Sequence, residues 1–191
     1  MPRPLRGLSA RSADPAGVSP LERLIAHDEI QQLANRYAVA VGAHAFDVLV
    51  ELFVDDVKVA PGHHGREALR SFYERTLDPA GVTLLLLGNH VIDLVDADHA
   101  TGVVFCYCET GTASKWIRQM IAYEDIYERR QNRWYFVSRR HELFYGLEVE
   151  GSPLSQEPAN WPSSNVGRGS VPWGWASWEA GSTPGPTPGP T

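Results

Sequence analysis

Apolar residues in the first third of the chain recur at helical spacing. Over 30–41 they fall at intervals of three and four residues, which places them on one helix face. The preceding segment is typical of a helix start, because Ser19 can cap the helix, Pro20 fits its first turn and Glu22 can complete a capping box. Gly42 is typical of a helix stop. We therefore predict one long amphipathic helix that ends near Gly42.

The second half of the chain changes to strand-like patterning. Val, Ile, Tyr, Phe and Trp dominate four segments, which are separated by short breaks rich in Asp, Gly and Asn. Three helices followed by four long strands predict an α+β fold. In it, the helices pack on one face of a strongly curved, mostly antiparallel sheet, with an internal cavity between the layers. The other predicted elements are helices over 46–53 and 65–77, a short strand over 55–60, and strands over 84–95, 101–109, 115–128 and 134–145.

Composition divides the chain into a body and two terminal segments. Residues 1–18 are rich in Pro, Arg, Gly and Ser and are predicted to be flexible, whereas 19–147 form the predicted domain. Residues 148–180 contain four of the six tryptophans, so we expect this extension to pack on the body or on a partner. The Pro-Gly-Thr repeat over 181–191 is predicted to be disordered.

Charge and composition exclude several classes of function. The net charge of −6 lacks the basic excess that phosphate binding needs, so no nucleic-acid partner is expected. Neither a secretory signal nor a membrane-length apolar run is present, and the expected compartment is the cytoplasm. Cys106 and Cys108 are too few and too close for a disulfide framework, and core packing is their expected role. Because metal-ligand spacing and glycine-rich phosphate loops are absent, we expect no metal and no cofactor.

Several short motifs, taken in order, resemble those of the SnoaL-like branch of the NTF2-like superfamily over about residues 20–147. This resemblance implies a cone-shaped fold that encloses a small hydrophobic ligand, and a homodimer formed through the outer face of the sheet. Related enzymes include dehydratases, dehydrochlorinases, isomerases and polyketide cyclases, and non-catalytic relatives include small subunits of ring-hydroxylating dioxygenases. The motifs are Asp28-Glu29-Ile30 with Leu33 and Tyr37-Ala38, Phe46-Asp47 with Leu52-Phe53 and Asp55-Asp56-Val57, Gly65-Arg66-Glu67-Ala68-Leu69, Gly88-Asn89-His90-Val91, and Tyr123-Glu124-Asp125 with Tyr127-Glu128-Arg129-Arg130 and Arg133-Trp134-Tyr135-Phe136.

The resemblance also implies candidate catalytic positions. Tyr37 corresponds to the helix tyrosine of bile-acid dehydratases, and Arg139 corresponds to a last-strand arginine of the dehydrochlorinase. The family's catalytic histidine corresponds to Asn89 or, after a shift of one residue, to His90. The usual catalytic aspartate is replaced by Gly42, so the usual His–Asp pair is not expected.

Strand periodicity bears on the same candidates. Arg139 and His141 are two residues apart and share a face, where they could stabilise an anion or exchange protons, or could lie on the surface. The adjacent pair of Arg139 and Arg140 must split between the two faces. His90 could act as a base near neutral pH, or could be a hydrogen-bonded residue at a strand end. Tyr37 could polarise a carbonyl or be an ordinary core tyrosine.

Aromatic residues on the strands are candidates for the ligand wall. Tyr107, Trp116, Tyr123 and Trp134 are expected to line the cavity and the core together. Asp125 shares a face with Tyr123 and is a further candidate ligand contact, although a solvent-facing or interface role is favoured for it. The predicted set is Tyr37, His90, Arg139 and His141 for catalysis, and Tyr107, Trp116, Tyr123 and Asp125 for substrate binding.

Three functions follow from these observations. The leading hypothesis is a cofactor-independent lyase or isomerase acting on a small cyclic hydrophobic molecule such as a polyketide, steroid or terpenoid. In it, Tyr37 and His90 handle the proton, and Arg139 or His141 stabilises negative charge. The alternatives are a non-catalytic binding protein of the same fold, which Gly42 favours, and a small subunit of a ring-hydroxylating oxygenase.

Overall fold

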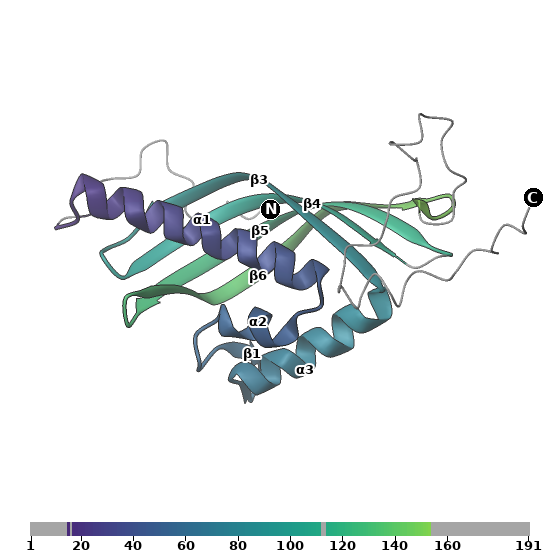
Figure 1. Cartoon of the computed structure of the whole chain (residues 1–191), viewed down its shortest axis with the longest axis horizontal. Coiled ribbons are helices and arrows are strands. Elements are labelled where there is room, and N and C mark those ends of the chain that lie inside the picture. The colour runs from purple at the N-terminus through teal and green to yellow at the C-terminus, as the bar shows by residue number, and fades with distance from the viewer. Residues whose placement is uncertain (1–14, 16, 112–113, 154–191) are drawn as a thin grey trace, which may run out of the picture.

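A computed structural model describes residues 15, 17–111 and 114–153 of the chain. The chain forms a helical layer and a four-stranded antiparallel sheet, which confirms the predicted α+β class (Figure 1). The extension beyond residue 153, with the tail over 181–191, lies outside the described residues, as does most of 1–18. The elements are α1 (Pro20–Gly42), α2 (Phe46–Glu51), β1 (Lys58–Ala60), β2 (His63–His64), α3 (Arg66–Leu77), η1 (Asp78–Ala80), β3 (Val82–Leu94), β4 (His99–Gly111), β5 (Trp116–Arg130) and β6 (Arg133–Val149).

Helix α1 begins and ends as its sequence predicts. The Ser19 hydroxyl accepts a hydrogen bond from the backbone N–H of Glu22, and the Glu22 carboxylate accepts one from the backbone N–H of Ser19. Its apolar face, which includes Ile30 and Tyr37, is buried against the sheet. None of the helices in the described ranges is long and apolar enough to cross a membrane.

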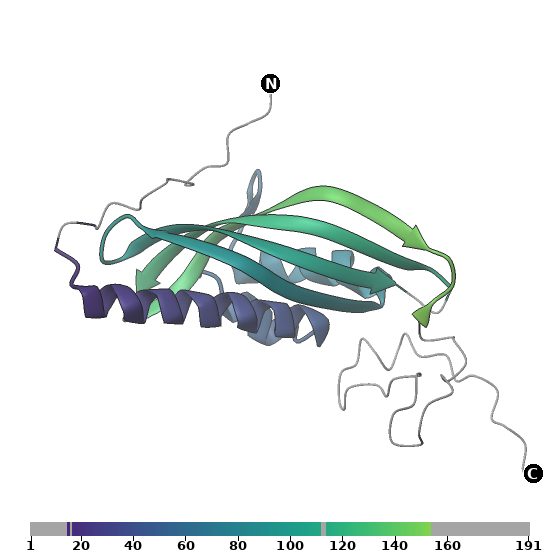
Figure 2. The same ribbon diagram turned by 90° about the horizontal axis from the view of Figure 1, so that it is seen from above.

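The sheet has the strand order β3-β4-β5-β6, so each strand pairs with its neighbour in sequence. Figure 2 shows the sheet curving over α1, which runs along it. A tight turn at Gln131 and Asn132, both with positive φ, joins β5 to β6 and places Asp125 opposite Arg139. A bulge between Leu87 and His90 shifts the register of β3, so that His90 pairs with Val104.

Tertiary contacts alter two predicted boundaries. Helix α2 ends at Glu51 rather than at residue 53, because the carbonyl of Leu52 accepts a hydrogen bond from the Phe136 N–H of β6. The strand predicted over 55–60 is limited to Lys58–Ala60. Asp55 and Asp56 instead form a turn whose carboxylates accept hydrogen bonds from Arg130 at 2.6 and 2.7 Å.

Candidate functional site

A cavity of about 570 Å³ lies between the helices and the concave face of the sheet. The C-terminal half of α3 and Tyr37 of α1 form one side, and strands β3 to β6 form the other. Most of the wall is apolar or carries hydroxyl groups. The lining residues are Tyr37, Phe72, Tyr73, Thr76, Leu77, Ala80, Thr83, Leu85, Cys108, Thr110, Gln119, Ile121, Tyr123, Arg139, Arg140 and His141.

A buried ion pair lies beside this cavity. Arg139 Nε donates to Asp125 Oδ1 at 2.8 Å, and Arg139 Nη2 donates to Asp125 Oδ2 at 2.7 Å. The exposed fractions of these two side chains are 2% and 0%. Burial lowers the pKa of the Arg139 guanidinium, but the charge and hydrogen bonds of Asp125 outweigh burial, and the net shift is upward. The guanidinium is therefore charged throughout the physiological pH range.

Three aromatic rings enclose the Arg139 guanidinium. Its Cζ lies 4.2 Å from the ring centre of Tyr37, 4.3 Å from that of Phe136 and 4.4 Å from that of Tyr123. Such cation–π contacts are stronger when the cation is shielded from water. Arg139 Nη1 is also buried, with no hydrogen-bond partner among the described residues. The cation is thus held against the rings of two tyrosines of the cavity wall.

A chain of hydrogen bonds extends from Asp125 away from Arg139. The Tyr127 hydroxyl donates to Asp125 Oδ2 at 2.7 Å, and His90 Nε2 lies 3.1 Å from the same hydroxyl. Because Tyr127 uses its single hydrogen on Asp125, its oxygen accepts from His90, and His90 therefore carries a hydrogen on Nε2. Gly102 makes room for this arrangement, since a Cβ there would lie 3.0 Å from the Tyr127 ring.

Tyrosine hydroxyls form the polar part of the cavity wall. The Tyr73 hydroxyl donates to the Tyr37 hydroxyl at 3.4 Å, and the Tyr123 ring lies edge-on to that of Tyr37 at 5.7 Å. Burial raises the pKa of Tyr37, so its hydroxyl keeps its hydrogen at neutral pH. With its oxygen accepting from Tyr73, Tyr37 can donate its own hydrogen to a ligand.

The structure places only part of the predicted site residues around the cavity. Tyr37, Tyr123, Arg139 and His141 line it, while His90 and Asp125 are connected to it through the hydrogen bonds of Asp125. The surface or interface role favoured for Asp125 is wrong, because its carboxylate is fully buried. Arg139 and Arg140 split between the two faces as expected, and Arg140 pairs with Glu124 and Glu142.

Tyr107 and Trp116 do not line the cavity. Strand alternation puts them on the opposite face of the sheet, where the Tyr107 hydroxyl and the Trp116 indole N–H both donate to the Glu109 carboxylate.

Tyr73 lines the cavity, although the sequence pattern predicted no site role for it. Its signal was its place on the apolar stripe of α3, four residues after Leu69.

His90 is expected to make the protein less stable as the pH falls from about 6.5 to about 4. Burial is the main cause that lowers the pKa of His90 from its ordinary value of 6.5 to about 4. Within this window the unfolded chain binds more protons than the folded one, so stability is full above it, declines through it and levels off below it. Urea unfolding of the wild type and of His90→Gln at pH 7 and pH 4.5 measures the effect.

Glutamine is the suitable replacement, because it keeps an N–H that can donate to Tyr127 but does not titrate. We expect His90→Gln to lose less stability than the wild type between the two pH values. Equal losses in the two proteins would show that His90 does not carry this dependence. The other histidines and the carboxylates are the same in both proteins, so their contributions cancel.

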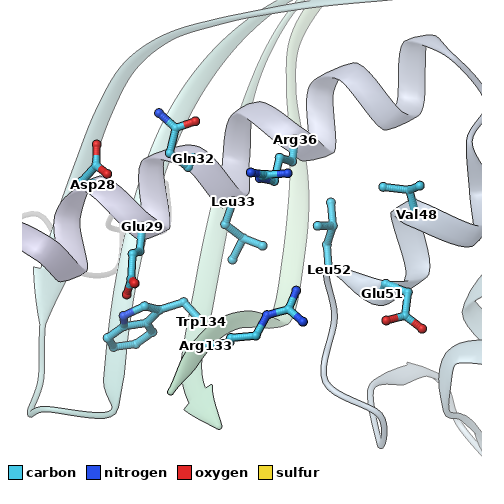
Figure 3. Close-up of a pocket in the computed structure, with 10 residues that line it drawn as sticks. All are labelled: Asp28, Glu29, Gln32, Leu33, Arg36, Val48, Glu51, Leu52, Arg133 and Trp134. Carbon is cyan, nitrogen blue, oxygen red and sulfur yellow. The ribbon is translucent and has the colours of Figure 1, made fainter. Parts of the chain in front are cut away.

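A second hollow, of about 470 Å³, lies between α1, α2 and the start of β6 (Figure 3). Five of its ten lining residues are charged, with acids and arginines on the same rim. That composition is less suited to a hydrophobic ligand than the tyrosine-lined cavity. Within the part of the chain that the structure describes, no three His, Cys, Asp or Glu residues are grouped so that they could hold a metal ion. Residues lining this hollow are Asp28, Glu29, Gln32, Leu33, Arg36, Val48, Glu51, Leu52, Arg133 and Trp134.

Solved structures with this fold include known enzymes. A hexachlorocyclohexane dehydrochlorinase of type 2 is 22% identical, with a TM-score of 0.64, over 72% of this chain and 100% of its own. The type 3 enzyme from Novosphingobium barchaimii is also 22% identical, with a TM-score of 0.63, over 70% and 97%. A chain assigned as a scytalone dehydratase from Novosphingobium aromaticivorans is 18% identical, with a TM-score of 0.61, over 72% and 99%.

At these identities the solved structures establish the fold and not the activity. A sequence search against curated proteins finds no match. The profile of the SnoaL-like domain matches residues 22–140, which is more than half of the chain and contains most of α1, strands β3 to β5, the start of β6 and the Arg139–Asp125 pair. The chain therefore belongs to the SnoaL-like domain family.

Proposed function

We propose that the protein is a cofactor-independent lyase or isomerase that acts on a small, cyclic and mainly hydrophobic molecule such as a polyketide, steroid or terpenoid. The supporting observation is the cavity of about 570 Å³, whose apolar wall carries Tyr37 in contact with the guanidinium of the buried Arg139–Asp125 pair. An apolar pocket with a few convergent polar groups is the usual form of a small-molecule site. The similarity in fold between this protein and a dehydrochlorinase and a dehydratase agrees with an elimination reaction.

Each polar group then has a role in the proposed reaction. The Tyr37 hydroxyl donates a hydrogen bond to a substrate oxygen, and the Arg139 cation against the Tyr37 ring favours the negative charge that develops there. His141 lines the cavity and is exposed to solvent, so it is the proposed base. It removes a proton from the carbon adjacent to the one that bears this oxygen. The electron pair left behind expels a leaving group or shifts a double bond.

This assignment moves the base from His90 to His141. His90 does not line the cavity, and its Nε2–H is directed to Tyr127. Gly42 occupies the usual aspartate position, so no carboxylate orients a histidine there. This same replacement supports a second candidate function, a non-catalytic protein that binds the same class of ligand.

Thermal-shift screening against steroids, polyketide fragments and terpenoids tests the proposal, followed by mass spectrometry of each stabilising compound after incubation with the protein. A compound that raises the melting temperature and is then converted would establish the enzyme. Compounds that stabilise the protein but stay unchanged would establish the binding protein instead. Absence of any stabilisation would contradict both and turn attention to protein partners, such as the large subunit of an oxygenase.

We also propose that the protein forms a homodimer through the outer face of the sheet. That face carries large apolar side chains that are about half exposed in the monomer, and burying them in a partner is favourable. Size-exclusion chromatography with light scattering measures the mass in solution, and a monomer at all concentrations would contradict the dimer. The apolar residues concerned are Leu86 (55% exposed), Phe144 (53%), Tyr145 (55%) and Leu147 (59%).

A further inference from the structure

The cavity faces the side chain of Arg139, which is neutralised by a carboxylate outside the wall, whereas the side chain of Arg140 lies on the opposite face of the sheet. Arg139 is paired with Asp125, and Arg140 is paired with Glu124 and Glu142. None of the described residues that line the cavity is an acid. Besides the His141 imidazole, the wall therefore presents hydroxyl groups, one amide and apolar surface to a ligand, and the charge of Arg139 is cancelled by that of Asp125.

Charge compensation at Arg139 is built into the fold. The Asp125 carboxylate contacts the guanidinium through both of its oxygens, and the Tyr127 hydroxyl holds one of these oxygens at 2.7 Å. All three side chains are shielded from water, so the pair is not weakened by solvent. An arginine beside a cavity would otherwise be a natural partner for a ligand carboxylate. Here the protein itself occupies that role.

We propose that Asp125 is a specificity-determining residue, which by neutralising Arg139 makes the cavity select uncharged cyclic ligands with an acceptor oxygen over carboxylates of the same shape. The inference rests on the proposed function, in that it requires a small cyclic ligand in this cavity. A carboxylate that enters loses its hydration and finds no uncompensated cation, which is costly. A ketone oxygen loses less hydration and can accept a hydrogen bond from Tyr37.

A matched pair of probes separates charge from shape. Methyl naphthyl ketone and naphthoate share one ring system and one carbonyl group. The ketone carries a methyl group on that carbonyl carbon, where naphthoate carries a charged oxygen. Calorimetric titration at pH 8, where histidine is mostly neutral, gives both dissociation constants. We expect the wild type to bind the ketone at least about tenfold more tightly, since an unpaired carboxylate must be desolvated.

The Asp125→Asn variant keeps the shape of the side chain and removes its charge, which leaves Arg139 uncompensated. We expect its preference to move toward naphthoate by about a hundredfold, because the ligand now supplies the missing anion. The double variant Asp125→Asn with Arg139→Gln has neither charge and is expected to prefer the ketone again. Tyr127→Phe retains both charges and is expected to keep the wild-type preference.

If Asp125→Asn does not fold without ligand, Arg139→Gln tests the same point with the opposite sign. It leaves Asp125 unpaired, and we expect it to discriminate against naphthoate more strongly than the wild type. A wild type that binds naphthoate as tightly as the ketone would overturn the inference, as would variants that do not change the preference. Binding of neither probe by the wild type would contradict the ligand cavity and the inference together.

Catalysis is not needed for this result. A protein that shows the expected charge preference but converts no compound in the screen would contradict the proposed enzyme activity and would leave the role of Asp125 intact.

Discussion

Arg139→Met is expected to lower the free energy of unfolding by about 3–5 kcal/mol, because it leaves the Asp125 carboxylate buried without its counter-ion. Removal of one partner of a buried ion pair costs more than removal of both, since the remaining charge keeps its full desolvation penalty. Methionine preserves much of the apolar stem that packs among Tyr37, Tyr123 and Phe136. Urea denaturation followed by circular dichroism measures the loss.

The double variant Arg139→Met with Asp125→Leu is the control for this result. It replaces the pair by apolar side chains of similar size, and we expect it to recover most of the lost stability. A single variant that loses less than about 1 kcal/mol would mean that water reaches Asp125 and that the pair is not buried in solution. That outcome would also remove the fixed cation on which the proposed site depends.

Tyr37→Phe is expected to reduce turnover by about a hundredfold or more, because it removes the hydroxyl proposed to donate to the substrate oxygen. The ring contacts with Phe53, Tyr123, Phe136 and Arg139 remain, so stability should change by only about 1 kcal/mol. Initial rates on the compound identified by the screen, together with an unfolding curve, separate the loss of chemistry from a loss of folded protein.

Tyr73→Phe is the matched control. It removes only the hydroxyl that donates to Tyr37 at 3.4 Å, so we expect a smaller loss of about tenfold or less. A Tyr37→Phe enzyme with turnover within about twofold of the wild type would rule out Tyr37 as the donor. If Tyr73→Phe proved the more damaging change, the donor role would pass to Tyr73, whose hydroxyl lines the same cavity.

Local sequence signals were sufficient for α1 and for the four long strands. Ser19 and Glu22 form the predicted capping box, α1 ends at Gly42, and the four strands occupy the predicted segments with somewhat greater length. These features depend on contacts between residues close in the chain or on a simple period, which a sequence displays directly. The end of α2 was misplaced because a distant strand, β6, bonds to the carbonyl of Leu52.

The histidine ambiguity could not be settled from the sequence. Asn89 and His90 are adjacent, and a strand period alone sends one to each face. The bulge between Leu87 and His90 resets the register and leaves Asn89 exposed while His90 reaches Tyr127, and neither residue lines the cavity. A bulge depends on the pairing of whole strands, so no local sequence pattern predicted this one.

The sequence by itself determined the α+β class, the amphipathic helix that presents Tyr37 and the split of Arg139 and Arg140 between two faces, because all of these follow from local periodicity. Only the tertiary structure decided that Asp125 and Arg139, fourteen residues apart, form a buried pair. Their meeting depends on the turn at Gln131 and Asn132, on the register of β5 with β6, and on the rings that exclude water. Asp and Arg are ordinary surface residue types, and it is burial that makes these two a fixed ion pair with no net charge beside a cavity. Burial is a property of the packed layers and not of any single segment.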